Sequence, residues 1–191
     1  MEFITDFGDS AVILPLSAAV MLCLVWGRWF SAALRWGLAV GGCGIVMVAL
    51  KIGFLACAAQ SFQGLLHSPS GHAAMSATVY GALAGLVAAR CRREWVVLPY
   101  AVAHLLIMAI ALSRIAVLAH SPLEVMVGLG VGTLFATAFT IGLGPPPSSA
   151  PSLFEMGVGV ATVLTVTHGA RLQIEAILMS LAFGARATLC P

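Results

Sequence analysis

Long apolar runs separated by short polar connections constrain this 191-residue chain more than any other feature. The runs cover residues 10–26, 37–59, 71–89, 95–113, 122–143 and 153–167. A helix needs about 20 apolar residues to cross a membrane. The chain is 61% hydrophobic and 8% charged, whereas soluble domains carry about 25% charged residues. The pattern therefore predicts an all-α integral membrane protein, a bundle of about six transmembrane helices.

Arginines gather in two of the connections and indicate an orientation. Arg28 and Arg35 lie in the first, where three neighbouring tryptophans predict an interfacial turn over 27–36, and Arg90, Arg92 and Arg93 lie in the third. Alternating spans put these connections on one side of the membrane, and the positive-inside rule makes that side cytoplasmic. The connections at 60–70 and 114–121 then face outward, and we expect the acidic, mixed residues 1–9 along the membrane surface. For a chain this small we expect a bacterial inner membrane, with those connections in the periplasm. The net charge of +2 gives no reason to expect a nucleic-acid partner, and the oligomeric state stays open.

The connection at 60–70 ends in Pro69-Ser70-Gly71-His72, where the third apolar run begins. Ser70 is a typical N-cap residue, and Gly71 lets a backbone amide approach a ligand closely. Amides at a helix N-terminus bind anions such as phosphate, and His72 beside them could protonate a leaving oxygen. On these residues alone, a capped helix start with an incidental histidine is the simpler interpretation.

A second polar group borders the connection at 114–121 and is formed by Ser113-Arg114, His120 and Glu124. The guanidinium of Arg114 is a planar fork suited to phosphate oxygens. Glu124 follows His120 by one helical turn, so its carboxylate could fix the imidazole tautomer and leave the other nitrogen as a nucleophile. The alternative is a helix-capping His–Glu pair with an interfacial arginine. Lys51, the chain's only lysine, is either a third member of the site or a lipid-facing residue that snorkels.

Together these residues resemble the type 2 phosphatidic acid phosphatase superfamily of membrane lipid phosphatases. That family has three motifs: Lys, six residues, Arg-Pro; then Pro-Ser-Gly-His; then Ser-Arg, five residues, His, three residues, Asp. The second motif is complete, and the third keeps its spacing with Glu124 in place of Asp. The first is degenerate, because Lys51 is followed by Ala58-Ala59 where Arg-Pro should stand. The resemblance covers roughly residues 45–130, and His67 is a candidate to replace the missing arginine.

The resemblance implies a metal-independent, acid-phosphatase-like lipid phosphatase without a cofactor. Its substrate would be a phosphomonoester or diphosphate of a lipid, phosphatidate-like or isoprenoid, and its other partners would be membrane lipids. The catalytic residues would be His120 as the nucleophile that forms a phosphohistidine, Glu124 orienting it, and His72 as acid and later base. The phosphate would be held by Lys51, Ser70, the Gly71 amide, Ser113 and Arg114. We expect one membrane-embedded phosphatase domain, 1–191, with core motifs at 51–124 and an interfacial C-terminal helix at 171–184.

Three other functions stay open. A lipid phosphotransferase would use the same phosphohistidine with an alcohol in place of water. A non-catalytic binder or transporter of phosphate lipids could keep the site after losing the arginine at Ala58. A haem or metal protein that uses the histidines is disfavoured, because Lys51 and Arg114 would repel a cation.

Overall fold

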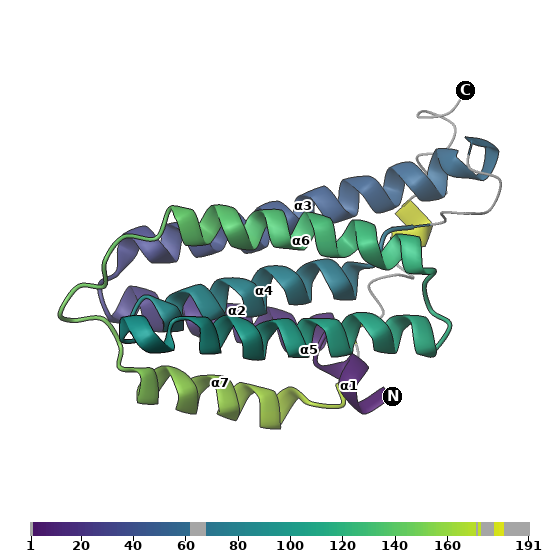
Figure 1. Ribbon diagram of the computed structural model, residues 1–191. Coiled ribbons are helices and arrows are strands. Elements are labelled where there is room, and N and C mark those ends of the chain that lie inside the picture. Colours follow the sequence, from purple (N-terminus) through teal and green to yellow (C-terminus); the bar gives the residue numbers. More distant parts are fainter. Residues whose placement is uncertain (1, 62–67, 171, 173–177, 182–191) are drawn as a thin grey trace.

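The computed structural model describes residues 2–61, 68–170, 172 and 178–181. Its helices are α1 (Glu2–Asp6), α2 (Ser10–Trp26), α3 (Phe30–Ser61), α4 (Gly71–Ala88), α5 (Val97–Ala116), α6 (Pro122–Ile141) and α7 (Leu153–Thr167), with a 3-10 turn, η1, at Arg93–Trp95. Helices α2 to α7 form one bundle in which consecutive helices run in opposite directions (Figure 1). The predicted all-α fold is confirmed: every element in the described part of the chain is a helix.

Within the described residues, four helical stretches are long and apolar enough to cross a membrane: Phe3–Trp26, Phe30–Leu55, Arg93–Ala116 and Pro122–Ile141. The other two members of the bundle are shorter, 18 residues in α4 and 15 in α7. Most of the α4 side chains are buried in protein, so this helix needs no apolar surface toward lipid. The six predicted runs correspond to α2–α7, and the predicted starts and ends of α2 and α7 match the structure.

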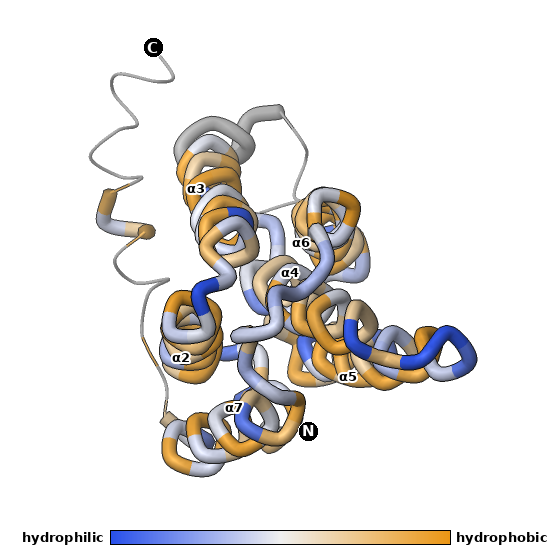
Figure 2. Tube along the Cα trace, turned by 90° about the vertical axis from the view of Figure 1, so that its left-hand side faces the viewer, coloured by the Kyte–Doolittle hydropathy of each residue, from blue (hydrophilic) through white to orange (hydrophobic). Residues whose placement is uncertain are grey.

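Helix α4 lies at the centre of the bundle, with α2, α3, α5 and α6 around it (Figure 2). Helix α6 packs closest, because glycines line the contact between the two helices. A side chain at Gly128 would strike the Ser70 carbonyl oxygen, and one at Gly132 would strike the Ala74 carbonyl oxygen. Small residues at such positions let helix backbones approach closely. The α4–α6 packing therefore fixes where the start of α4 lies relative to α6.

The first connection differs from its prediction. We expected an interfacial turn over 27–36, but α3 already begins at Phe30. Trp36 is 1% exposed, donates its indole N–H to the Ser17 carbonyl oxygen at 3.1 Å and packs edge-on against Phe139. Tryptophan in this stretch indicated an interface by composition, but the tight α2–α3 turn draws Trp36 into the core.

One end of the bundle collects both polar groups that the sequence singled out. Lys51 lies toward the end of α3, the second motif starts α4, Ser113-Arg114 lies in the last turn of α5, and His120 precedes α6. Because consecutive helices alternate in direction, all four positions meet at the same end (Figure 1). The arginine-bearing connections lie at the opposite end. The predicted C-terminal helix at 171–184 lies largely outside the described residues.

Candidate active site

The start of α4 is held in place by Glu124 of α6. The Ser70 hydroxyl accepts a hydrogen bond from the Ala73 amide at 3.4 Å, which makes Ser70 the N-cap, as predicted. The Ser70 amide donates to the Glu124 carbonyl oxygen at 3.0 Å, and the Ser68 amide donates to Glu124 Oε1 at 3.1 Å. The amides in the first turn of a helix carry partial positive charge. This end of α4 is therefore a suitable binding place for an anion.

Glu124 also contacts His120. The distance from His120 Nδ1 to Glu124 Oε2 is 2.9 Å, and both side chains are 6% exposed. Glu124 and Ser121 form a capping box at the start of α6, so the carboxylate caps the helix and binds the histidine at once. A proton on Nδ1, assigned from this hydrogen bond, puts the lone pair of the neutral ring on Nε2. That is the arrangement a nucleophilic histidine requires.

Lys51 reaches the start of α4 from α3. Its side chain is buried, with 5% of the residue exposed, which excludes the interpretation as a snorkelling, lipid-facing lysine. A methyl group built on Gly71 would lie 3.5 Å from Lys51 Cε and 3.9 Å from Nζ. The missing side chain of Gly71 thus gives the ammonium group room beside the first amides of α4. Both contribute positive charge to the same place.

Ser113 and Arg114 lie in the last turn of α5 and make different contacts. The Ser113 hydroxyl donates to the Ile110 carbonyl oxygen at 2.7 Å and forms a 2.7 Å hydrogen bond with the Thr5 hydroxyl. The Arg114 carbonyl oxygen accepts from the His120 amide at 3.3 Å, so the connection folds back and keeps these two residues near each other. The phosphate-holding roles of Ser113 and Arg114 stay predictions.

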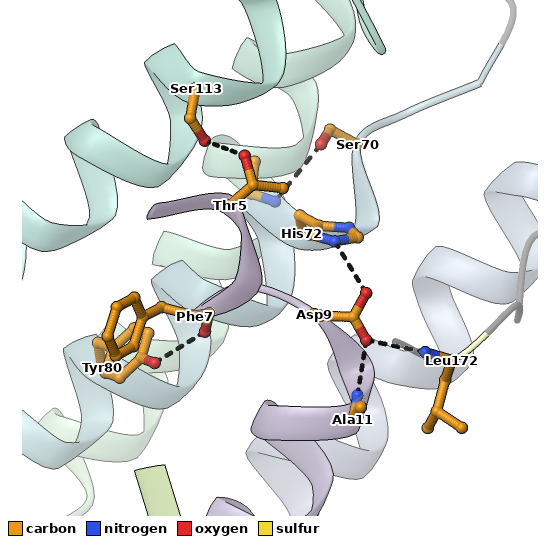
Figure 3. Close-up of polar contacts among 10 residues, drawn as sticks. Thr5, Phe7, Asp9, Ala11, Ser70, His72, Tyr80, Ser113 and Leu172 are labelled. Atoms are coloured by element: carbon orange, nitrogen blue, oxygen red, sulfur yellow. Dashed lines mark hydrogen bonds and ion pairs between the residues drawn. The ribbon is translucent and has the colours of Figure 1, made fainter. Parts of the chain in front are cut away.

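Two residues of the N-terminal segment, Thr5 and Asp9, contact the motifs and were not singled out from the sequence. Figure 3 shows Thr5 directed at Ser113 and Asp9 directed at His72. The distance from Asp9 Oδ2 to His72 Nε2 is 3.5 Å. The sequence offered one signal, because Asp6 and Asp9 are its only two aspartates. The structure shows that both are buried.

The described residues include the degenerate first motif, but they do not include His67. Ala58 lies within α3, two turns beyond Lys51. His67 lies outside the described residues, so its suggested replacement of the missing arginine stays a prediction.

Comparison with known proteins identifies the family. Residues 32–144 match the sequence profile described as the PAP2 superfamily, and this range includes all three motif positions. The chain belongs to the PAP2 superfamily. It is also 30% identical, over 145 residues, to an "Uncharacterized 22.5 kDa protein in cps region" of Klebsiella pneumoniae, a match that covers 73% of this chain and 68% of that protein. No solved structure matches the chain significantly.

Membership in this phosphatase family supports hydrolysis of a phosphoric ester as the general activity. The apolar helices indicate a protein of the membrane.

Proposed function

We propose that the chain is one membrane-embedded domain that hydrolyses a phosphomonoester or diphosphate of a lipid, phosphatidate-like or isoprenoid, through a phosphohistidine. The observation that carries the proposal is the buried His120–Glu124 pair, linked through Glu124 to the N-terminus of α4. A nucleophile oriented by a carboxylate stands there beside a site for an anion.

The first step transfers the phosphoryl group to the protein. Nε2 of His120 attacks phosphorus, the bond from phosphorus to the leaving oxygen breaks, and His72 donates a proton to that oxygen. The leaving group is an alcohol from a monoester, or a lipid monophosphate from a diphosphate. Lys51, Arg114, Ser113 and the amides that follow Ser70 stabilise the charge on the equatorial oxygens.

The second step releases inorganic phosphate. A water molecule attacks phosphorus, its proton passes to His72, and the bond from phosphorus to Nε2 breaks. His120 and His72 return to their starting protonation states, so atoms and protons balance over the cycle. A phosphotransferase would differ in this step alone, with a lipid alcohol in place of water.

The position of the site in the bundle supports a lipid substrate. The polar groups gather where four helices end, which is the level at which lipid headgroups lie, while apolar helix faces extend along the lipid tails. The arginine-bearing connections, with Arg28 and Arg90 among them, lie at the opposite end. The positive-inside rule then supports a site at the periplasmic face of a bacterial inner membrane.

A release assay tests the proposal. Purified full-length protein in detergent micelles would be incubated with phosphatidic acid, phosphatidylglycerophosphate or undecaprenyl diphosphate, and inorganic phosphate measured. We expect turnover of at least one substrate, its loss in His120→Asn, and a fall of at least about 100-fold in His72→Ala. Wild-type turnover retained by a well-folded His120→Asn protein would refute the phosphohistidine. Tight lipid binding without phosphate release would favour the non-catalytic binder.

A further inference from the structure

The N-terminal segment, α1 and the turn that joins it to α2, is fixed against the core of the bundle. The Tyr80 hydroxyl of α4 donates to the Phe7 carbonyl oxygen at 2.8 Å, and Thr5 binds Ser113 of α5. A methyl group built on Gly8 would lie 2.8 Å from a side-chain carbon of Ile110, so the turn leaves no space for a larger residue. The position of Asp9 is therefore set by its surroundings.

The Asp9 carboxylate is oriented by three contacts (Figure 3). Its Oδ1 accepts from the Ala11 amide at 2.8 Å, which caps α2, and from the Leu172 amide at 3.2 Å. Its Oδ2 lies 3.5 Å from His72 Nε2, and the two side chains are 11% and 17% exposed. Because one oxygen is held by backbone amides, the other is directed at the histidine. A carboxylate so shielded from water interacts strongly with a neighbouring imidazolium.

We propose that Asp9 is a positioning residue that keeps His72 in its protonated form and holds its Nε2, so that the proton on Nδ1 goes to the leaving oxygen. This inference rests on the proposed function, in which His72 is the acid. An anionic neighbour favours the charged form of a histidine. The same contact favours the second step, in which His72 becomes charged again on taking a proton from water. Each of the two proposed catalytic histidines then has its own carboxylate: Glu124 for His120 and Asp9 for His72.

Other charged groups lie at the same end of the bundle as the start of α4 and contribute to the protonation of His72. Lys51 comes from α3, Arg114 from α5 and Asp6 from α1. His120 lies just before α6, and Glu124 lies in its first turn. The two cations oppose a proton on His72, while Glu124 is engaged with His120. Asp9 contacts His72 directly, with 3.5 Å between Oδ2 and Nε2, so removing the charge of Asp9 should have a clear effect on the protonation of His72.

The test measures kcat/KM against pH for full-length wild type, Asp9→Asn and Asp9→Glu with the lipid phosphate that wild type hydrolyses. Asparagine can still accept the Ala11 hydrogen bond and is a good N-cap, so Asp9→Asn removes the charge and leaves the cap. The profile of kcat/KM reports the free enzyme's acid and base. We expect the alkaline limb of Asp9→Asn to move to lower pH by about one unit, which is about a tenfold loss above neutral pH and little loss near pH 5.5. Asp9→Glu should return the limb toward wild type.

Tyr80→Phe is the matched control, because it removes another contact of the same segment without touching a charge. We expect it to lower the melting temperature and leave the limb in place. Asp9→Ser, which also keeps an N-cap, replaces Asp9→Asn should that variant fail to fold. The role of Asp9 is overturned if the alkaline limb of the kcat/KM profile stays in place in Asp9→Asn and Asp9→Ser, or if kcat/KM falls equally at all pH values. Turnover by the wild type would still uphold the phosphatase in that case. A wild type that releases no phosphate overturns both.

Discussion

Substituting Gly128 tests whether the α4–α6 packing positions the site. A methyl group on Gly128 would overlap the Ser70 carbonyl oxygen and lie 3.3 Å from the Ala73 Cβ. Carbon–oxygen contacts closer than about 3.3 Å are uncommon, so α4 and α6 would have to separate by about 1 Å. As the two helices separate, the hydrogen bonds of 3.0 and 3.1 Å that join Glu124 to Ser70 and Ser68 would lengthen. A misplacement of about 1 Å can cost about 100-fold in rate.

The stability effect should be smaller than the effect on rate. Overpacking costs about 1–3 kcal/mol, and the higher helix propensity of Ala over Gly returns about 1 kcal/mol. The net loss of about 0–2 kcal/mol corresponds to at most about 8 °C in melting temperature for a chain of this size. Gly128→Ala should thus remain folded in detergent and lose about 100-fold in phosphate release.

Gly130→Ala is the control on the same helix. Gly130 is exposed, and a methyl group there would meet no atom within 4 Å. We expect wild-type turnover and an equal or higher melting temperature. The reasoning is refuted by a Gly128→Ala protein with wild-type turnover, or by two variants that lose activity equally.

Two further predictions concern orientation and metal dependence. In intact cells, a membrane-impermeant thiol reagent should label a single cysteine introduced at Leu118, which is 92% exposed at the end of the bundle that holds the site. The reagent should not label Cys91 at the other end. The reverse pattern would put the site in the cytoplasm. Phosphate release should survive excess EDTA and be inhibited by vanadate, because Lys51, Arg114 and the α4 amides supply the positive charge that magnesium provides elsewhere. Activity that vanishes with EDTA and returns with magnesium would contradict that assignment.

Local patterns made the helices and one of the two histidine pairs predictable. Asp9 and Ser152 cap α2 and α7, and polar caps before apolar runs can be read from the sequence. His120 and Glu124 lie one turn apart, so their contact follows from helix geometry. The family motifs added Lys51, whose approach to Gly71 joins separate helices and has no local signal.

The contact of Asp9 with His72 could not be predicted in the same way. It depends on which helix end the N-terminal segment packs against, and the acidic, mixed residues 1–9 indicated only a position along the membrane surface. The prediction of an interfacial position for Trp36 was wrong for a related reason. Tryptophan beside arginine is typical of an interface, yet the packing of α3 against α2 buries the indole. Both cases turn on tertiary contacts that a one-dimensional pattern does not contain.

The charge balance of the site links the missing arginine to the role of Asp9. A phosphate monoester carries a charge of about −1.5 to −2 at neutral pH, and Ala58 stands where the family has a cation to meet it. An ionised Asp9 beside a neutral His72 would add negative charge to a site that must bind an anion. Beside a protonated His72 the pair is neutral overall and still has a proton to donate. An aspartate at this position is therefore compatible with phosphate binding when His72 carries the proton, which is the state that the first chemical step requires.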